Sequence, residues 1–392
     1  MNASEREGAV FFHTYKRLPL EIDHGEGVYL YSKDGTRYLD MFGGLAVNAL
    51  GYSHPLVLQA IQHQSRKYIH LSNYYLQEPQ LQLAEMLVKY SGYARVFFCN
   101  SGTEAIEGAL KLCRKWGATR NKMELVSFSN AFHGRTMGAL SIMDRPKYRN
   151  GYQPFLPDCR LVEFNNVKDL DSAITERTVA VVLEFIQGEG GIRPVSVELV
   201  QRLNILKAKF GFLIVADEIQ SGIGRTGKLF GFQHYDAQPD IVVVAKPIGG
   251  GLPLGAFLGN AAVADVLEPG VHGTTFGGNP VACAAGAVVL QEILDGGLMK
   301  NAERMGTLLR SELVKLQSEF PAIVKEVRGF GLMLGIQLDR DGEPIVTVMR
   351  ERRILVNCTD QTVIRFLPPL IIEEQHINET ARALREVLSG LR

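Results

Sequence analysis

Two apolar runs, FLIVAD at residues 212–217 and DIVVVAK at residues 240–246, decide the fold. Similar runs precede them in the chain: RVFFCN (95–100), ELVSFS (124–129) and VAVVLEF (179–185), with stretches of helical pattern among them. Continuous apolar runs suit strands that helices cover on both faces, as in a parallel or mostly parallel sheet. The pattern therefore predicts an α/β domain that spans about residues 50–270.

The segments outside this domain predict a second, smaller lobe of α+β type. Residues 27–40 (GVYLYSKDGTRYLD) alternate apolar and polar residues around an Asp-Gly turn, which is typical of a hairpin. Towards the other end, we expect a long helix from Asn279-Pro280 and a strand at GLMLGIQL (331–338), in a lobe that packs with the hairpin. We thus expect an N-terminal segment (1–50), a large domain (51–270) and a C-terminal small domain (271–392).

Composition favours small-molecule chemistry. Lys+Arg and Asp+Glu number 42 each in 392 residues, so no net field would attract nucleic acid or an anionic membrane. The five cysteines are scattered, odd in number and free of close-paired spacing, which predicts neither a disulfide framework nor a metal site. We find no export signal and no membrane span, and we expect a cytoplasmic protein.

The chemistry is expected at the carboxyl ends of the strands, where ligands gather in open α/β folds. Ser101-Gly102-Thr103 follows the first run and opens a helix, where free amides and the helix dipole attract phosphate. A plain helix cap is an equal alternative. After ELVSFS, Phe132 could lie against a flat heteroaromatic ring and Arg135 could bind a carboxylate, although a packed core Phe and a surface Arg remain open.

Three further strand ends carry charged residues. VAVVLEF includes Glu184 and leads to QGEGG, which contains Glu189; one of these acids could be a solvated loop charge. Asp217 ends an apolar strand and should face a positive group, because burying an unpaired carboxylate is costly. Lys246 also ends an apolar strand; without a partner its pKa would fall and it would become a nucleophile, although a buried lysine is more often salt-bridged. Pro247 is expected to push Lys246 towards extended geometry.

The string HGTTFGGNP (272–280) repeats the combination of hydroxyls and glycines before a helix. Thr274 and Thr275 could therefore supply a second set of phosphate donors. The alternative is an ordinary loop at a helix start.

With these pieces in order, the chain resembles the class III pyridoxal-phosphate (PLP) aminotransferases of fold type I, and among them the acetylornithine and ornithine aminotransferases. The motifs that carry this resemblance span nearly the whole chain: NSGTEAIEGALKL, FHGRT, QGEGG, DEIQSGIGRTGKLF, AKPIGGGLPLGA, GTTFGGNP and RFLPPL. The resemblance implies a homodimer with shared active sites, no nucleic-acid or membrane partner, and a mostly parallel central sheet with helices on both faces.

The resemblance implies a role for each cofactor-binding residue. Lys246 would carry PLP as a Schiff base and move protons as base and acid, while Asp217 would pair with the pyridine nitrogen. Gln220 would bond the ring hydroxyl, and Phe132 and Ile219 would cover the two ring faces. The phosphate would be held by Ser101, Gly102, Thr103 and Thr275 of the partner subunit, and His133 completes the cofactor-binding set.

The resemblance also implies two half reactions in one site. An amino donor leaves its nitrogen on the cofactor, and 2-oxoglutarate then collects it as glutamate. Arg135 would clamp a carboxylate in both halves, while Arg365 would bind the α-carboxylate of glutamate and otherwise pair with Glu189. Tyr15 and Thr274 complete the substrate-binding set.

Two departures from the family pattern concern the substrate. Phe185 stands where a proline is common, which could alter the bend into QGEGG. Leu45 stands where ornithine δ-aminotransferases carry a tyrosine, which favours N2-acetylornithine over free ornithine, because a free α-amino group would lose a polar partner. We expect transfer of its δ-amino group to 2-oxoglutarate, which gives N-acetylglutamate 5-semialdehyde and glutamate in arginine biosynthesis.

Several alternatives stay open on sequence grounds. The donor could be ornithine, 4-aminobutyrate, succinylornithine or the lysine precursor whose ω-amino group is linked to aminoadipate semialdehyde. An aminomutase would use the same lysine. A binding protein on a retired scaffold would predict loss of Lys246 or Asp217, and both are present. A dinucleotide-binding dehydrogenase would need a GxGxxG run in a first βαβ unit, and we find none.

Overall fold

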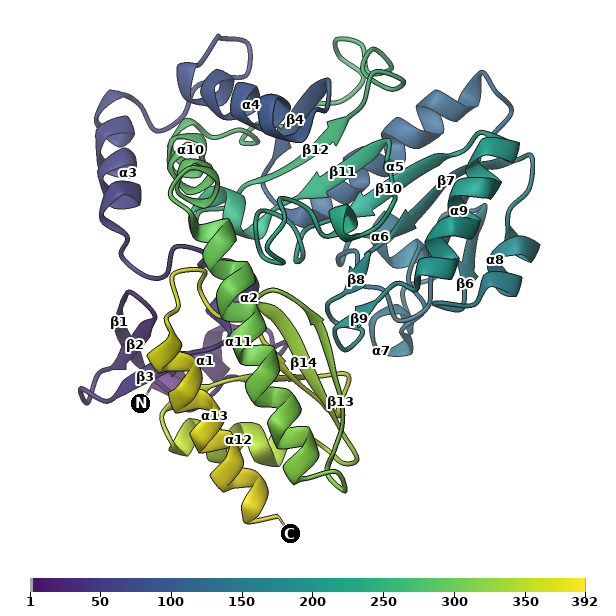
Figure 1. Ribbon diagram of the computed structural model, residues 1–392. Helices are drawn as coiled ribbons and strands as arrows, with labels where there is room; N and C mark the ends of the chain where they lie inside the picture. Colours follow the sequence, from purple (N-terminus) through teal and green to yellow (C-terminus); the bar gives the residue numbers. More distant parts are fainter. Residues whose placement is uncertain (1–2, 392) are drawn as a thin grey trace.

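The computed structural model describes residues 3–391, and a seven-stranded sheet forms the centre of its larger part (Figure 1). Every pairing between neighbouring strands is parallel except those of β12 with β11 and β4, so the sheet is mostly parallel, as predicted. In order across the sheet, the strands are β4 (Arg95–Cys99), β12 (Gly255–Gly259), β11 (Ile241–Val244), β10 (Leu213–Asp217), β7 (Thr178–Leu183), β5 (Glu124–Phe128) and β6 (Cys159–Val162).

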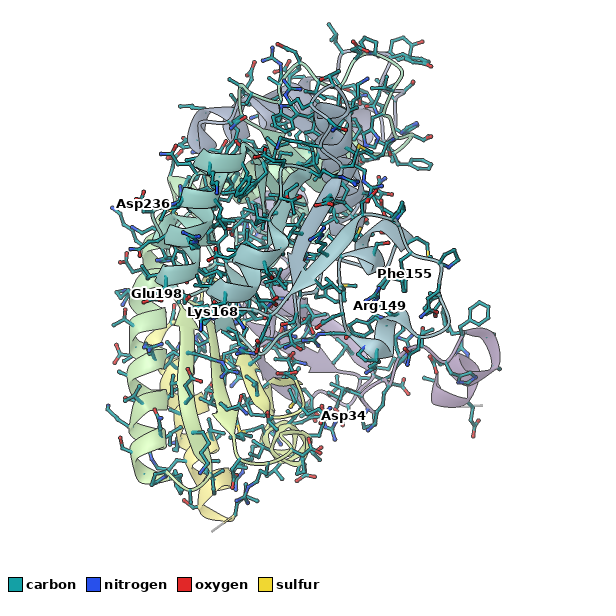
Figure 2. The ribbon with its side chains drawn as sticks, turned by 90° about the vertical axis from the view of Figure 1, so that its right-hand side faces the viewer. Asp34, Arg149, Phe155, Lys168, Glu198 and Asp236 are labelled. Atoms are coloured by element: carbon teal, nitrogen blue, oxygen red, sulfur yellow. The ribbon has the colours of Figure 1, made fainter. Side chains whose placement is uncertain are left out.

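Both faces of this sheet are buried, which explains its continuous apolar runs. In β10, Leu213 and Val215 belong to the core that α5 (Gly102–Ala118) covers, whereas Ile214 and Ala216 belong to the core that contains Leu203 of α9 (Val197–Phe210). Successive side chains of a strand point to opposite faces, so an apolar run without polar alternation requires cover on both sides. Figure 2 shows Glu198 and Lys168, from α9 and α8 (Val167–Ala173), on the outer surface of the helical layer.

The smaller lobe joins the two ends of the chain, as expected. Strand β15 pairs in parallel with β3, so the C-terminal segment extends the N-terminal hairpin. One sheet has the order β1 (Ile22–Glu26), β2 (Tyr29–Ser32), β3 (Arg37–Asp40) and β15 (Ile354–Leu355). The other has the order β13 (Val324–Phe330), β14 (Met333–Leu338), β17 (Val363–Phe366) and β16 (Asn357–Thr359). The helices of this lobe are α11 (Leu298–Glu319), α12 (Glu343–Glu351) and α13 (Glu374–Ser389).

Helix α10 (Pro280–Leu294) connects the two parts. It begins at Asn279, as predicted, where the side chain accepts hydrogen bonds from the amides of Val281 and Ala282. It packs against α3 (Pro55–Lys67), α4 (Glu78–Ser91) and the short helix η2 (Lys246–Gly249), and α11 then runs down into the smaller lobe (Figure 1). We therefore propose that the large domain extends through α10 and does not end at residue 270.

The remaining elements are short. They are α1 (Ala3–Val10), α2 (Gly43–Ala46), α6 (Met137–Ser141), α7 (Pro146–Arg149), η1 (Gly231–His234) and the β8–β9 pair (Ile186–Gln187 and Arg193–Pro194). Within residues 3–391, no single helix has the length and apolar character needed to cross a membrane. Helices α10 and α11 have that length and composition only when taken together, and they bend by 59° where they meet.

Candidate active site

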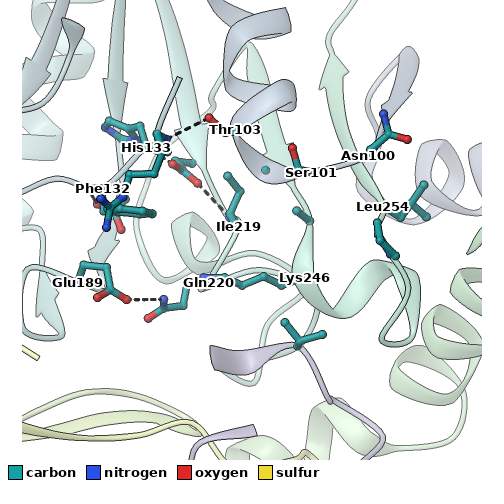
Figure 3. Close-up of a pocket in the computed structure, with 18 of the residues that line it drawn as sticks. Asn100, Ser101, Thr103, Phe132, His133, Glu189, Ile219, Gln220, Lys246 and Leu254 are labelled. Atoms are coloured by element: carbon teal, nitrogen blue, oxygen red, sulfur yellow. Dashed lines mark hydrogen bonds and ion pairs between the residues drawn. The ribbon is translucent and has the colours of Figure 1, made fainter. Parts of the chain in front are cut away.

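A pocket of about 440 Å³ opens at the carboxyl ends of β4, β10 and β11, beside the turn that follows β5 (Figure 3). Most of the predicted site residues line it: Ser101, Gly102, Thr103, Phe132, His133, Arg135, Glu189, Asp217, Ile219, Gln220 and Lys246. The structure adds residues that the sequence did not place there, namely Val47, Asn100, Ala245 and the 251–254 loop. The sheet thus brings together segments that lie far apart in the chain.

Lys246 lies at the start of η2, immediately after β11, and its side chain enters the pocket (Figure 3). The expected extended geometry is wrong: its φ is 54°, because the chain turns sharply into η2 instead of continuing the strand. A positive φ in a residue other than glycine is strained and clusters at functional sites. In the part of the chain that the structure describes, the Nζ atom has no hydrogen bond or ion pair. Burial lowers the pKa of Lys246 to about 8, although the charge of Glu189 opposes this shift.

Asp217 ends β10 and is 3% exposed. Its Oδ2 lies 2.7 Å from Nδ1 of His133, and its Oδ1 accepts the amide N–H of Ile219 at 3.1 Å. Burial alone would lower the pKa of His133, but the hydrogen bond and the charge of Asp217 raise it above its ordinary value. Within the protein, the side chain that faces Asp217 is therefore His133, which can carry a positive charge when it is protonated. The other ring nitrogen of His133 lies 3.2 Å from Oγ of Ser127.

The first turn of α5 forms another wall of the pocket. Ser101 caps the helix by accepting the amide of Glu104 at 3.3 Å, so the capping interpretation holds together with the position at the pocket. Gly102 lets Ile219 pack closely against the helix start, because a Cβ there would lie 2.7 Å from Cδ1 of Ile219 and would displace that side chain. The hydroxyl of Thr103 lies 3.0 Å from that of Thr136 and accepts the amide of Arg135. Free amides at such a helix start favour a phosphate.

Phe132 and Arg135 occupy the turn after β5. The Phe132 ring packs edge to face against Tyr148, with ring centres 5.8 Å apart, and the Arg135 guanidinium lies 3.8 Å from the centre of the Tyr148 ring. The amide of Phe132 donates to Glu184 at 2.9 Å. Glu184 also accepts the amide of Gly188, so one buried carboxyl links the Phe132 turn to the QGEGG turn. Burial raises the pKa of Glu184 to about 7.

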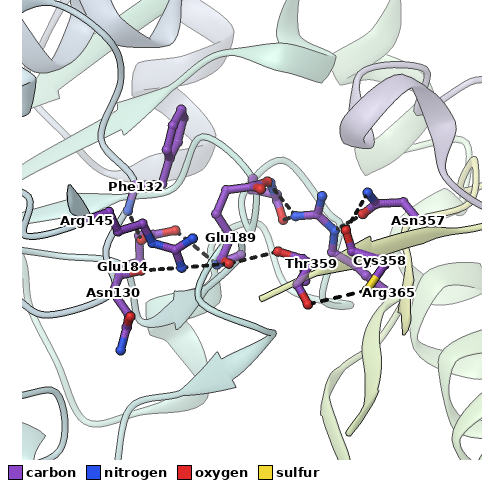
Figure 4. Close-up of polar contacts among 11 residues, drawn as sticks. Asn130, Phe132, Arg145, Glu184, Glu189, Asn357, Cys358, Thr359 and Arg365 are labelled. Atoms are coloured by element: carbon purple, nitrogen blue, oxygen red, sulfur yellow. Dashed lines mark hydrogen bonds and ion pairs between the residues drawn. The ribbon is translucent and has the colours of Figure 1, made fainter. Parts of the chain in front are cut away.

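Buried Arg365 and half-buried Glu189 form an ion pair with N–O distance 2.6 Å (Figure 4). Arg365 is 1% exposed, and its Nη1 also donates to Oε1 of Gln220 at 3.1 Å. Burial alone would raise the pKa of Glu189, but the charge of Arg365 brings it below its ordinary value. This pairing is the one that the resemblance implied, and it joins the two lobes.

Four predicted site residues are not among those that line the pocket of the single chain: Arg365, which reaches it only through Glu189 and Gln220, and Tyr15, Thr274 and Thr275. Tyr15 is 74% exposed, and Thr275 is exposed as well. Thr274 accepts the side chain of Asn100 at 3.3 Å and the amide of Gly277 at 3.2 Å, so it anchors the 272–280 loop to the end of β4. The helix-start interpretation of this loop is confirmed by α10, which follows it directly.

The sequence analysis missed the residues that hold the ion pair, namely Arg145, Asn357 and Thr359. No local motif marks them, because each reaches the pair only through tertiary packing. Among residues 3–391, no cluster of three or more His, Cys, Asp or Glu side chains is placed to hold a metal ion.

The arrangement fits PLP. It offers an amine without a partner for the aldehyde, a buried carboxylate for a cationic ring nitrogen, an aromatic side chain for a flat ring and a helix N-terminus for the phosphate.

Comparisons with known proteins agree with this geometry. Residues 10–388 match the family model of the class-III aminotransferases. The acetylornithine aminotransferase of Methanocaldococcus jannaschii is 43% identical over 383 residues, 96% of each chain. That of Methanopyrus kandleri is 41% identical over 397 residues, which cover 100% of this chain and 99% of the relative.

Solved structures are similar over the same length. The ornithine aminotransferase of Toxoplasma gondii has a TM-score of 0.94 at 30% identity, covering 99% of this chain and 94% of that one; a second structure of it is described as having partial occupancy of PLP at the active site. The omega transaminase of Pseudomonas jessenii, in complex with PMP, has a TM-score of 0.94 at 26% identity, covering 100% and 98%. The chain therefore belongs to the class III aminotransferases and has their PLP-dependent fold.

Proposed function

We propose that this aminotransferase moves the δ-amino group of N2-acetylornithine to 2-oxoglutarate, which gives N-acetylglutamate 5-semialdehyde and glutamate. The observation that carries the two-substrate proposal is the ion pair between Arg365 and Glu189, a residue that lines the Lys246 pocket. Glu189 neutralises the charge of Arg365 while they are paired, and the guanidinium is free for a carboxylate when the pair opens. The names of the full-length relatives, which are acetylornithine aminotransferases, support the choice of donor and a place in arginine biosynthesis.

When bound, PLP supplies an electron sink for the carbanion at the substrate carbon. The protein's part is to hold and to move protons. Asp217 would keep a positive charge on the ring nitrogen, while the start of α5 and Thr103 would hold the phosphate. Phe132 and Ile219 would confine the ring, and Gln220 would bond its hydroxyl. In its neutral form, Nζ of Lys246 takes the proton from the substrate carbon that bears the amino group; such transfers contribute about 10²- to 10⁴-fold in rate.

Arg135 and Arg365 divide the substrate carboxylates between them. In the donor half reaction, Glu189 neutralises Arg365 and Arg135 binds the carboxylate of the donor. In the acceptor half reaction, 2-oxoglutarate brings two carboxylates. The Glu189–Arg365 pair then opens, and Arg365 binds one of these carboxylates. A fork of guanidinium donors suits both pairings, since it matches a carboxylate in two positions at once.

We further propose a cytoplasmic homodimer. Large side chains near the 272–280 loop are strongly exposed, among them Tyr74, Leu76 and Phe276. Asn73, next to them, donates to the backbone oxygens of Thr274 and Gly277, so this surface is continuous with the loop that carries Thr275. Exposed apolar groups of this size mark interaction surfaces. In a dimer, Thr275 of the partner subunit would complete the phosphate site.

Ornithine is the second candidate donor, because solved ornithine aminotransferases share the fold over nearly the whole chain. Leu45, at the bend of α2 where its φ is 64°, weighs against it, since it offers no polar partner for a free α-amino group. The test is kcat/KM for N2-acetylornithine, ornithine and 4-aminobutyrate with 2-oxoglutarate, measured as glutamate formed. The proposal requires the highest value for N2-acetylornithine; a higher value for another amine would overturn the choice of donor.

A further inference from the structure

Strand β16 carries two side chains that contact the two partners of the Glu189–Arg365 pair (Figure 4). Oδ1 of Asn357 accepts Nε of Arg365 at 2.8 Å. The hydroxyl of Thr359 donates to the backbone oxygen of Glu189, also at 2.8 Å. One short strand of the smaller lobe therefore touches a residue from its own sheet and a residue from the larger part of the molecule.

The sheet register explains why β16 can do this. Asn357 pairs directly with Arg365 across the antiparallel β16–β17 ladder, so their side chains are neighbours on one face. Thr359 lies two residues further on and shares that face, because side chains alternate along a strand. The side-chain Nδ2 of Asn357 donates to the backbone oxygen of Cys358 at 3.0 Å, which fixes the side-chain oxygen towards Arg365.

The two contacts act on the pair in different ways. Asn357 binds only Nε of Arg365, so the two Nη atoms remain available to carboxylates. In this structure Nη1 contacts the carboxylate of Glu189 and the side-chain amide of Gln220. Thr359 holds only the backbone of Glu189, together with Nη2 of Arg145 at 2.8 Å. Asn357 thus orients Arg365 whether or not Glu189 is bound, whereas Thr359 favours only the state in which Glu189 returns to Arg365.

We propose that Asn357 and Thr359 are positioning residues that set the balance between the two substrates. Thr359 favours the paired state, which suits the amino donor, and Asn357 presents Arg365 to the second carboxylate of 2-oxoglutarate. This inference rests on the proposed two-substrate function and adds to it the residues that tune it.

The proposal requires that Thr359→Val weakens the binding of the amino donor and strengthens the binding of a dicarboxylate. Loss of the hydroxyl removes one hydrogen bond to Glu189 and frees Arg365 more easily. The KM for N2-acetylornithine should rise about twofold to tenfold, the range set by one hydrogen bond, while glutarate should bind more tightly by a similar factor. Glutarate is the probe because it carries two carboxylates and no group that can react. Its affinity is measured by calorimetry on the PLP-loaded protein, without turnover.

Three further variants complete the experiment. Thr359→Ser keeps the hydroxyl and should restore both values. Thr362→Val is the matched control: it removes a hydroxyl near the same strand that bonds Gln337 at 2.6 Å and contacts neither Glu189 nor Arg365. Asn357→Leu should weaken glutarate binding by a factor of about two to ten, because Arg365 loses its orientation.

The inference is overturned if Thr359→Val weakens the binding of N2-acetylornithine and of glutarate together. It is also overturned if the KM for the donor and the glutarate affinity are the same in Thr359→Val as in Thr362→Val. Failure of the proposed function looks different. In that case the wild-type protein makes no glutamate from N2-acetylornithine, while the glutarate affinities of the variants still decide the role of β16.

Discussion

The two ends of the active site differ in how completely one chain builds them. Around Lys246, every polar group of the expected cofactor site except the second phosphate donor lies in one buried pocket. Tyr15 and Thr275, which we call the rim, lie outside that pocket and are exposed to solvent. The difference teaches that the strand ends of the sheet place most of the expected cofactor and substrate residues within one chain, whereas Tyr15 and Thr275 depend on the dimer that we propose.

The largest expected effect concerns the inner end. Lys246→Ala removes both the amine that holds PLP and the group that moves the proton, so turnover should fall by at least about 10³-fold. Single-turnover measurement of glutamate formation checks this. Lys33→Ala, at an exposed turn, is the control and should keep full activity. A Lys246→Ala variant with more than a tenth of the wild-type rate would contradict the assignment.

Asp217→Asn should be next in size. It replaces a buried carboxylate that lies 2.7 Å from His133 and that is expected to stabilise the charge of the ring nitrogen; loss of one such electrostatic group lowers a rate by about 10²-fold. The spectrum of bound PLP should shift as well, because the ring nitrogen loses its counter-charge. Unchanged kcat together with an unchanged spectrum would show that Asp217 serves His133 alone.

The pH dependence of PLP attachment tests the same end without mutation. The charged form of Lys246 is disfavoured by burial, so its pKa lies near 8 instead of 10.5. Only the neutral amine attacks the aldehyde; below pH 8 its fraction, and with it the rate of attachment to the cofactor-free protein, should fall about tenfold per pH unit. Stopped-flow absorbance follows this rate. A pH midpoint of the attachment rate near the ordinary lysine pKa would contradict the lowered pKa of Lys246.

The smallest effect is expected at the rim. Thr275→Ala should weaken PLP binding by about tenfold, the lower end of the range for one hydroxyl bond to a charged group, and leave kcat at saturating PLP nearly unchanged. Equilibrium dialysis against PLP gives the dissociation constant. Sedimentation of the same variant shows whether the dimer persists. If PLP binds the variant as tightly as the wild type, the rim takes no part in the phosphate site.

The same contrast explains what could be predicted from the sequence. Strands with both faces buried, such as β10 and β11, are visible as apolar runs that end in Asp217 and Lys246. Strand β12 escaped notice because it is only GAFLG and lies inside a Gly-rich stretch. The left-handed backbone of Lys246 was missed because the bias that Pro247 imposes is weaker than the tertiary turn into η2.

The positioning residues Asn357 and Thr359 show a second limit of prediction from the sequence. Asn357 and Thr359 belong to a three-residue strand, and their importance comes from its register with β17, which no local pattern reveals. Glu189 and Arg365 lie 176 positions apart and were connected through the family resemblance alone. Strand ends can thus be predicted locally, whereas contacts between lobes depend on the folded chain.

The most direct test of the central claim is the site of PLP attachment. The protein is loaded with PLP, reduced with borohydride, digested and analysed by mass spectrometry. We predict that the reduced cofactor is found on the peptide that contains Lys246 and on no other. Its presence on a different lysine, or its absence from every peptide of a protein that has bound PLP, would contradict the assignment of Lys246.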